Sequence, residues 1–280
     1  MIALIAGLAA AVAWSFAVSG SARAGRVTSA TTVVAWTAIV EAVAAAPWSI
    51  GQGIPAVLGG RLLVWFFVAG AASTAGLMLG VKALQTGRIG VTAPILSTEG
   101  AIAAVIGLVA GESASAPVII ALAVIACGVL LASIPRSHAP HGPSAGRSGQ
   151  GPAIVSALSF GLGLYGMGRL SAQLSASWAL WSAGLVGTVA VAVPMAARGT
   201  LIPRRARGLV LGAAVAEAAG YFAYVLAAQH NVAIAAVVSS QFAGIALLAS
   251  VAAGERLARI QVAGITAMLV GVAVLGALQH

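Results

Sequence analysis

Three glutamates are the residues of this chain best placed to do chemistry. The chain has five acidic residues, and Glu41, Glu99 and Glu217 lie at or near the middle of long apolar segments. A carboxylate at the centre of a membrane helix costs about 2.5–3.5 kcal/mol, so such residues are usually functional. We expect them to be protonated or to face a wet cavity, and we consider all three as proton-coupling residues. The alternative is a neutral carboxyl that only hydrogen-bonds a neighbouring helix.

Glu217 is followed by two phenols on one helical stripe. Tyr221 and Tyr224 stand at i+4 and i+7, which places them on the same face of a helix as the carboxyl group. Such a face suits an amine-bearing or aromatic ligand through ion pairing, hydrogen bonding and cation–π contact. The alternative is a packing stripe, with tyrosines near a helix end serving as interface residues.

Glu99 belongs to a polar cluster that has a counterpart later in the chain. It follows Ser97 and Thr98, with Pro94 one turn earlier, and proline can break a helix so that a freed carbonyl lines a cavity. The counterpart is Ser239-Ser240-Gln241. Two polar clusters at equivalent depth predict a midplane binding site, although Ser and Thr also serve in plain helix–helix contacts.

Aromatic residues elsewhere complete the predicted site. Trp14 in the first apolar segment and Tyr165 in the sixth are candidates to face the interior. The glycines around Tyr165, at positions 161, 163, 166 and 168, allow close approach of helices. The substrate-binding residues that we predict are Glu217, Tyr221, Tyr224, Glu99, Thr98, Ser240, Gln241, Trp14 and Tyr165.

The other two acids, Glu112 and Glu255, are predicted to be structural. Each follows a glycine and precedes an apolar segment, where a carboxylate can stabilise a helix N-terminus or pair with a nearby arginine. No catalytic pattern is present, because the histidines lack metal-ligand spacing and no glycine-rich phosphate loop follows a strand. We therefore expect neither an enzyme nor a bound metal or cofactor.

The composition predicts a membrane protein. The 280 residues are 61% hydrophobic and only 7% charged, far from the quarter that is typical of soluble domains. The net charge of +9 does not indicate nucleic-acid binding, because the basic residues stand singly between apolar runs. Their expected use is to set membrane orientation. The single cysteine, Cys127, excludes an internal disulfide and is expected to be a packing residue.

The length rule for membrane helices gives about ten apolar segments, and we expect an all-α protein. Between the fifth and sixth, residues 135–152 read as a flexible polar linker, which separates a first repeat, residues 1–134, from a second, residues 153–280. The expected segments are 2–19, 30–50, 62–81, 89–110, 116–134, 153–171, 176–197, 208–228, 231–253 and 260–279.

The two halves are similar in sequence when shifted by about 143 positions. The shift places Ser97 on Ser240 and Gly111-Glu112 on Gly254-Glu255. Because each half has an odd number of spans, the halves must have opposite orientations, as in the inverted repeats of many secondary transporters. The fold expected is two inverted five-helix repeats around a central cavity.

Basic residues indicate that both termini lie outside. Gaps on the side of the first loop hold most of them, whereas the other side holds only Arg61 and Arg169, and basic loops stay in the cytoplasm. The basic residues of the richer side are Arg23, Arg26, Lys82, Arg88, Arg136, Arg147, Arg198, Arg204, Arg205, Arg207, Arg256 and Arg259.

Over nearly its whole length the chain resembles the EamA-like transporters of the drug/metabolite transporter superfamily. The resemblance rests on the two five-span halves and on short motifs, with Ser113 replacing the arginine of the Gly-Glu-Arg segment in the first half. These motifs are Ala13-Trp14-Ser15-Phe16, Gly111-Glu112, Gly254-Glu255-Arg256-Leu257 and Val262-Ala263-Gly264.

The resemblance implies a basket-like bundle of ten helices that moves small metabolites or drugs by alternating access. It also implies cytoplasmic termini, against the loop charges. We expect a multi-pass protein of the bacterial inner membrane that exports small metabolites such as amino acids, with proton coupling a candidate mechanism. The expected partners are the lipid bilayer and a small-molecule substrate, with a monomer as the unit.

Two alternatives remain open. Within transport, the substrate is a cationic drug, a nucleoside or a sugar conjugate. In a different class, the chain is a non-transporting membrane assembly or lipid-handling component, which predicts a tightly packed interior with no solvated cavity around the three glutamates.

Overall fold

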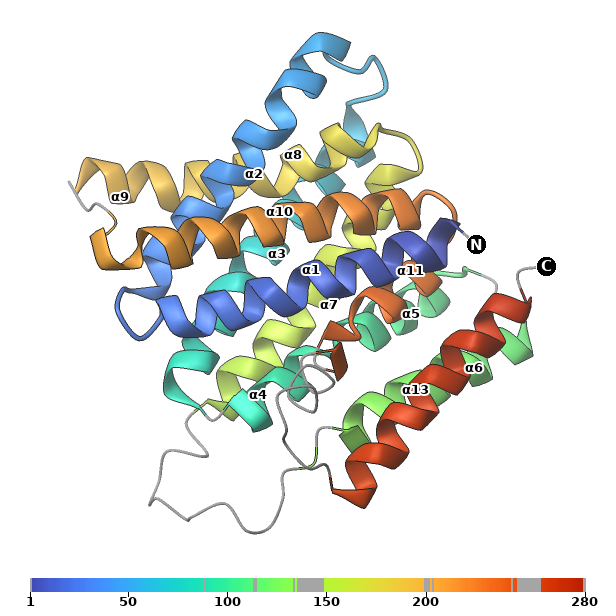
Figure 1. Cartoon of the computed structure of the whole chain (residues 1–280). Coiled ribbons are helices and arrows are strands. Elements are labelled where there is room, and N and C mark those ends of the chain that lie inside the picture. Colours follow the sequence, from blue (N-terminus) through green and yellow to red (C-terminus); the bar gives the residue numbers. More distant parts are fainter. Residues whose placement is uncertain are drawn as a thin grey trace.

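The computed structural model is all helical in the part of the chain that it describes (Figure 1). It describes residues 2–87, 89–112, 115–132, 149–198, 204–242 and 258–278, with positions 134, 202, 244 and 245 in addition. Most of the predicted linker 135–152 and the Gly254-Glu255-Arg256-Leu257 motif lie outside these residues. The last part of the predicted linker is helical, because the helix that follows begins at Gln150.

Each predicted apolar segment is helical over most of its described residues. The first half contains α1 (Ile2–Ala24), α2 (Ala30–Gln52), α3 (Gly60–Thr86), α4 (Ile89–Leu96), α5 (Glu99–Val109) and α6 (Ala116–Ala132). The second half contains α7 (Gln150–Ser171), α8 (Ala176–Gly187), η1 (Thr188–Ala192), α9 (Val193–Ala197), η2 (Arg204–Ala206), α10 (Arg207–Ala228), α11 (Val232–Ser239) and α13 (Arg259–Leu278).

Six described helical segments are long and apolar enough to cross a membrane. They are α1, α2, α3, α7, the continuous run from α8 to α9, and the run from η2 to α10. The predicted all-α membrane class is thus confirmed, whereas the remaining predicted spans correspond to shorter helices within the described residues. Two of those spans, 89–110 and 231–253, are interrupted.

Local sequence explains how the long helices begin and bend. Ser29 caps α2 by accepting a hydrogen bond from the backbone N–H of Thr32 at 3.1 Å, which satisfies an otherwise unpaired donor. Between α8 and α9 the helix widens into the π-helical turn η1, where the N–H of Val193 donates to the carbonyl of Thr188. Pro194 follows directly, and its missing N–H explains the irregular turn.

The two interrupted spans break at positions that the repeat makes equivalent. The first turns at Ser97 and Thr98, between α4 and α5, and the second turns at Ser240 and Gln241, after α11. Ser97 donates its hydroxyl to the carbonyl of Ala93 at 3.1 Å. Ser240 does the same for Val237 at 2.9 Å. The Ser97 hydroxyl adds to the hydrogen bond that the Ala93 carbonyl already accepts from the Ser97 N–H at 3.0 Å. Both serines thus place extra donors at a helix break in an apolar environment.

The most extensive helix contacts join the two halves of the chain. In the first half α1, α2, α3, α5 and α6 pack respectively on α10, α8, α7, α11 and α13 of the second. The α6–α13 pair lies at one edge of the bundle (Figure 1), and α13 makes its main contacts with α6. The centre of the molecule is therefore built by both halves together.

Glycines around Tyr165 make the α7 contacts close, as predicted. A Cβ atom at Gly161 would lie 2.5 Å from the side chain of Ile102, and one at Gly163 would lie 2.6 Å from Ser73 Oγ. Ser156 adds a hydrogen bond of 2.6 Å from its hydroxyl to the carbonyl of Gly76 on α3. Helix α7 is thus held against α3 and α5 almost backbone to backbone.

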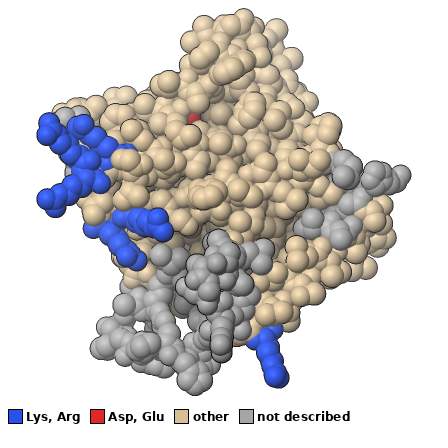
Figure 2. Space-filling view, viewed as in Figure 1, with Lys and Arg blue, Asp and Glu red and all other residues tan. Residues whose placement is uncertain are grey.

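Basic side chains gather at one end of the bundle. Figure 2 shows most of the visible ones at the edge where α1 ends and α10 begins and one apart from them at the lower border, while the middle of this face carries almost none. Arg23 belongs to the last turn of α1, and Arg204 and Arg205 belong to η2. In Figure 1, α1 begins and α13 ends at the opposite side. Basic residues at the end of the bundle opposite to the termini are the pattern from which we predicted that both termini lie outside. The orientation in the membrane stays a prediction.

Candidate functional site

A small cavity between the two halves brings together four of the predicted site residues. We call it the acidic cavity; it measures about 40 Å³, enough for a few water molecules. Helices α1, α3, α4, α5, α7 and α10 contribute to it, and Phe242, just after the second break, completes it. The lining residues are Trp14, Val18, Ser21, Leu77, Gly80, Val81, Leu84, Leu96, Glu99, Phe160, Glu217, Tyr221 and Phe242.

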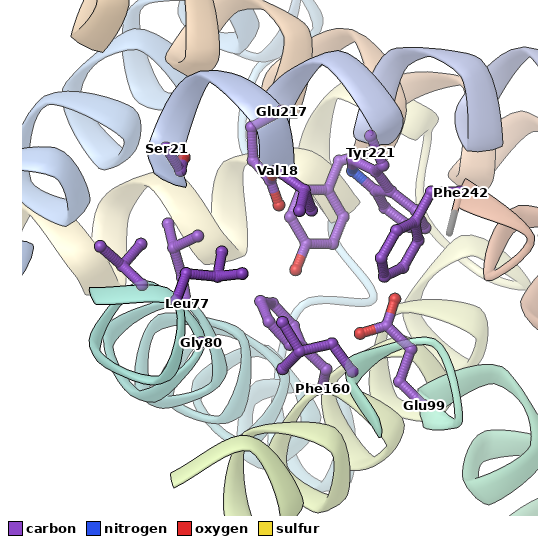
Figure 3. Close-up of a pocket in the computed structure, with 13 residues that line it drawn as sticks. Val18, Ser21, Leu77, Gly80, Glu99, Phe160, Glu217, Tyr221 and Phe242 are labelled. Atoms are coloured by element: carbon purple, nitrogen blue, oxygen red, sulfur yellow. The ribbon is translucent and has the colours of Figure 1, made fainter. Parts of the chain in front are cut away.

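Glu99 and Glu217 point into this cavity from opposite halves. Figure 3 shows both carboxyl groups and the Tyr221 hydroxyl directed toward the space above Phe160. The two glutamates are only 5% and 7% exposed, and no lysine or arginine of the described residues forms an ion pair with them. Two buried acids without a counter-charge at one cavity can hold protons or pair with a cation that enters from outside.

Aromatic rings form one wall beside Glu217. The indole of Trp14 meets the ring of Tyr221 edge to face, with centroids 5.3 Å apart. Gly220 makes this possible, because a Cβ there would lie 2.4 Å from the Trp14 indole. The opposite wall carries Phe160, which lies against Gly76 on α3. The cavity therefore combines carboxyl groups with π faces, as a site for an organic cation requires.

Glu41 is buried in a separate small pocket next to the acidic cavity. This pocket measures about 10 Å³ and is lined by Val34, Ala38, Glu41, Ser73, Thr74, Leu77, Ala183 and Tyr221. Leu77 and Tyr221 also line the acidic cavity, so the two spaces share a wall. We call the smaller space the Glu41 pocket.

Thr98, Ser240 and Gln241 line a different space from the acidic cavity. It is a mostly apolar groove of about 410 Å³ between α5, α6, α7 and the end of α11. Thr98 donates its hydroxyl to the carbonyl of Ile95 at 2.7 Å, and Gln241 Nε2 donates to the carbonyl of Val237 at 2.7 Å. Their polar groups thus hold the helix breaks, and their predicted contact with substrate stays a prediction.

Tyr224 and Tyr165 do not line the acidic cavity. Tyr224 is fully buried and donates its hydroxyl to the carbonyl of Leu164 on α7 at 2.6 Å. Tyr165 packs edge to face on Trp65, with centroids 5.5 Å apart. Both tyrosines thus join helices.

Sequence reasoning missed the apolar part of the lining. Phe160, Val18 and Leu77 have no signal in the sequence that separates them from ordinary core residues. Phe242 had one, because the repeat places it at the position equivalent to Glu99. When one repeat has a candidate site residue, the residue at the equivalent position of the other repeat can be expected to line the same cavity.

Glu112 pairs with an arginine, as its structural role predicted. Arg169 Nη1 lies 3.8 Å from Glu112 Oε1, and both side chains are about one-third to two-fifths exposed. Such an exposed pair contributes little to stability. Glu255 lies outside the described residues. No group of three potential metal ligands occurs among the residues that the structure describes.

Comparison with known families agrees with this architecture. Residues 1–134, which contain α1 to α6, match the model of the EamA-like transporter family. The predicted resemblance to EamA-like transporters is confirmed over these residues. This family is one of membrane transporters, and the matched part includes Trp14, Glu41 and Glu99.

A similar fold has also been seen in a crystal. A solved structure of another protein superposes with a TM-score of 0.75 at 13% sequence identity, covering 99% of this chain and 96% of the other. At that identity the likeness shows the fold alone. No curated protein sequence matches the chain.

Proposed function

We propose that this EamA-like protein exports a small amine-bearing metabolite, such as an amino acid, through the acidic cavity. The observation that carries the proposal is that Glu99 and Glu217, buried and without a described basic partner, face one cavity between the two halves. An ammonium group bound between them would compensate both the burial and the lack of a counter-charge.

The same carboxyl groups give a route to proton coupling. A protonated carboxyl does not pair with an ammonium, whereas an ionised one does. If the substrate ammonium and the proton compete for Glu99 and Glu217, outward movement of one is linked to inward movement of the other. The rings of Trp14 and Tyr221 add cation–π contact, which is worth about 2 kcal/mol or more where water is excluded.

Alternating access is supported by the size and position of the cavity. A ligand site has roughly 300–1,000 Å³, whereas the acidic cavity has about 40 Å³. A metabolite therefore fits only after the halves have moved apart. The pairing of α1 with α10 and of α3 with α7, and the equivalent breaks at 97–98 and 240–241, support two inverted five-helix repeats around that cavity.

The cavity favours transport over a packed, non-transporting membrane component, since that alternative predicts no cavity at the glutamates. We place the protein as a monomer in the bacterial inner membrane, crossed about ten times by the length rule for membrane helices.

Counterflow in proteoliposomes tests the proposed function. Purified full-length protein is reconstituted into liposomes preloaded with one unlabelled amino acid at a time, and uptake of the same tritiated compound is followed. We expect transient accumulation for at least one amino acid and none in protein-free liposomes. Accumulation only of organic cations, nucleosides or sugar conjugates would move the substrate to the other class. No counterflow of any compound would contradict the proposal.

A further inference from the structure

We propose that Glu41 is a second proton-holding residue, in a pocket of its own, that exchanges protons with the acidic cavity through Ser73 and Tyr221. The inference rests on the proposed function and assigns the proton and the solute to different places. Glu99 and Glu217 then bind the solute, while Glu41 stores the proton that drives it.

The position of Glu41 is unusual for a residue that does not bind solute. It is 4% exposed and stands midway along α2, away from the acidic cavity lining. No basic side chain among the described residues pairs with it. Its burial is therefore tolerated only if it carries a proton or another cation for much of the transport cycle.

Hydroxyl groups surround the carboxyl group of Glu41. Ser73 Oγ is buried, lines the Glu41 pocket and interacts with the Tyr221 hydroxyl. The Thr74 hydroxyl donates to the carbonyl of Gly70 at 2.8 Å, which leaves its lone pairs free to accept. Buried hydroxyls that can still accept or donate a hydrogen bond suit a site for a water or a small polar ligand.

The Glu41 pocket has the size of a single water molecule. Its volume is about 10 Å³, close to the minimum of roughly 10–15 Å³ that one water requires. A water there would have Glu41, Ser73 and Thr74 as polar neighbours, within the two to four partners that a buried water typically has. The space is too small for a metabolite and suits a proton carrier.

Tyr221 links the Glu41 pocket to the acidic cavity. Its side chain lines both spaces and lies within electrostatic range of Glu217, Glu41 and Glu99. The ring is fixed by its edge-to-face contact with Trp14. A hydroxyl in this position can accept a proton on one side and release its own on the other.

The titratable groups that face Glu41 come from one neighbouring helix. Helix α10 contributes Tyr221, with Glu217 one turn before it, whereas α3 contributes hydroxyls and α8 contributes Ala183. Glu99 lines the acidic cavity and does not line the Glu41 pocket. The described lining of the Glu41 pocket holds no Lys, Arg or His, so Glu41 responds to the charge of the acidic cavity.

Protonated Glu41 gives its proton to a pocket water held by the Ser73 hydroxyl, that water passes one proton to the Tyr221 hydroxyl, and the Tyr221 hydroxyl releases its own proton to ionised Glu217. Glu41 becomes negative, Glu217 becomes neutral, and water and tyrosine are unchanged. Neutralised Glu217 no longer holds an ammonium, so proton arrival and solute release coincide.

Separate measurements of exchange and of driven accumulation test the inference. The full-length protein is reconstituted in liposomes, and the probe is a tritiated mixture of the standard amino acids. Counterflow at equal pH needs only solute binding and movement, whereas accumulation against a gradient under an imposed pH difference needs coupling. Glu41→Gln mimics the neutral acid, Ser73→Ala removes only a hydroxyl, and Glu112→Gln makes the same change as Glu41→Gln outside both pockets.

We expect Glu41→Gln to keep counterflow and to lose pH-driven accumulation completely. Ser73→Ala should keep counterflow and slow pH-driven accumulation, and Glu112→Gln should resemble the parent in both. pH-driven accumulation by Glu41→Gln equal to that of the parent would overturn the inference while leaving the proposed function intact. If Glu41→Gln does not fold, normal pH-driven accumulation by Ser73→Ala overturns it instead. Absence of counterflow in the parent protein overturns the inference together with the proposed function.

Discussion

Glu99 and Phe242 line the same cavity although they lie 143 positions apart in the chain, at equivalent places of the two halves. Each stands directly after a helix break, and each enters the acidic cavity from its own half. The breaks thus present a carboxyl group on one side and an aromatic ring on the other. The sequence difference between the repeats becomes a difference between two walls of one site.

The two tyrosines of α10 should respond differently to loss of the hydroxyl. Tyr221→Phe removes a hydroxyl from the acidic cavity, and we expect slower transport with little change in unfolding temperature. Tyr224→Phe removes the hydrogen bond to Leu164 and leaves a buried carbonyl without that partner. We expect it to destabilise the protein by about 1 kcal/mol while transport is retained.

Thermal unfolding of detergent-solubilised protein and amino-acid counterflow distinguish the two tyrosine variants. Each variant is the control for the other, because the chemical change is identical. A loss of transport in Tyr224→Phe with unchanged stability would show that Tyr224 belongs to the binding site after all.

A larger residue at Gly220 should dislodge Trp14 from the cavity wall. A Cβ at this position would lie 2.4 Å from the Trp14 indole, so we expect Gly220→Val to lower stability by about 1–3 kcal/mol through overpacking. Gly212→Val on the same helix is the matched control, since nothing lies within 4 Å of its Cβ. Equal unfolding temperatures for both variants would refute the close contact.

A side chain at Gly100, where the two helix breaks cross, should also disrupt packing. A Cβ at Gly100 would lie 2.2 Å from the carbonyl oxygen of Ala236 and 2.5 Å from Ser240 Oγ. We expect Gly100→Ala to separate α5 from α11 and to abolish counterflow. Gly208→Ala, where nothing lies within 4 Å, should leave counterflow unchanged. Active Gly100→Ala protein would show that the two breaks need not touch during transport.

The helices were predictable from sequence because membrane spans have a simple signature. The rule of about twenty apolar residues placed the starts of α2 and α8 at the residues where the structure has them. Acids are so rare here that position within an apolar segment selected Glu41, Glu99 and Glu217, and the last two line the acidic cavity. The informative signal was therefore a charged residue within an otherwise apolar segment.

The shape of the cavity was not predictable from sequence, because residues on one face of a helix can contact two different neighbouring helices. Tyr221 and Tyr224 share the stripe expected from their spacing, and both rings approach Trp14. Their hydroxyls nonetheless differ, because that of Tyr224 reaches a backbone carbonyl of α7. Which polar end finds a partner depends on the backbone of another helix, which spacing along one helix does not report.

The most direct test of the central claim is counterflow by Glu99→Gln and Glu217→Gln, with Glu112→Gln as the matched control. If an ammonium group binds between the two buried acids, each variant loses a charged hydrogen bond, and its apparent affinity falls roughly tenfold to a hundredfold. The control should transport as the parent does. Correctly folded Glu99→Gln and Glu217→Gln proteins that transport every amino acid with the affinity of the parent would contradict the account.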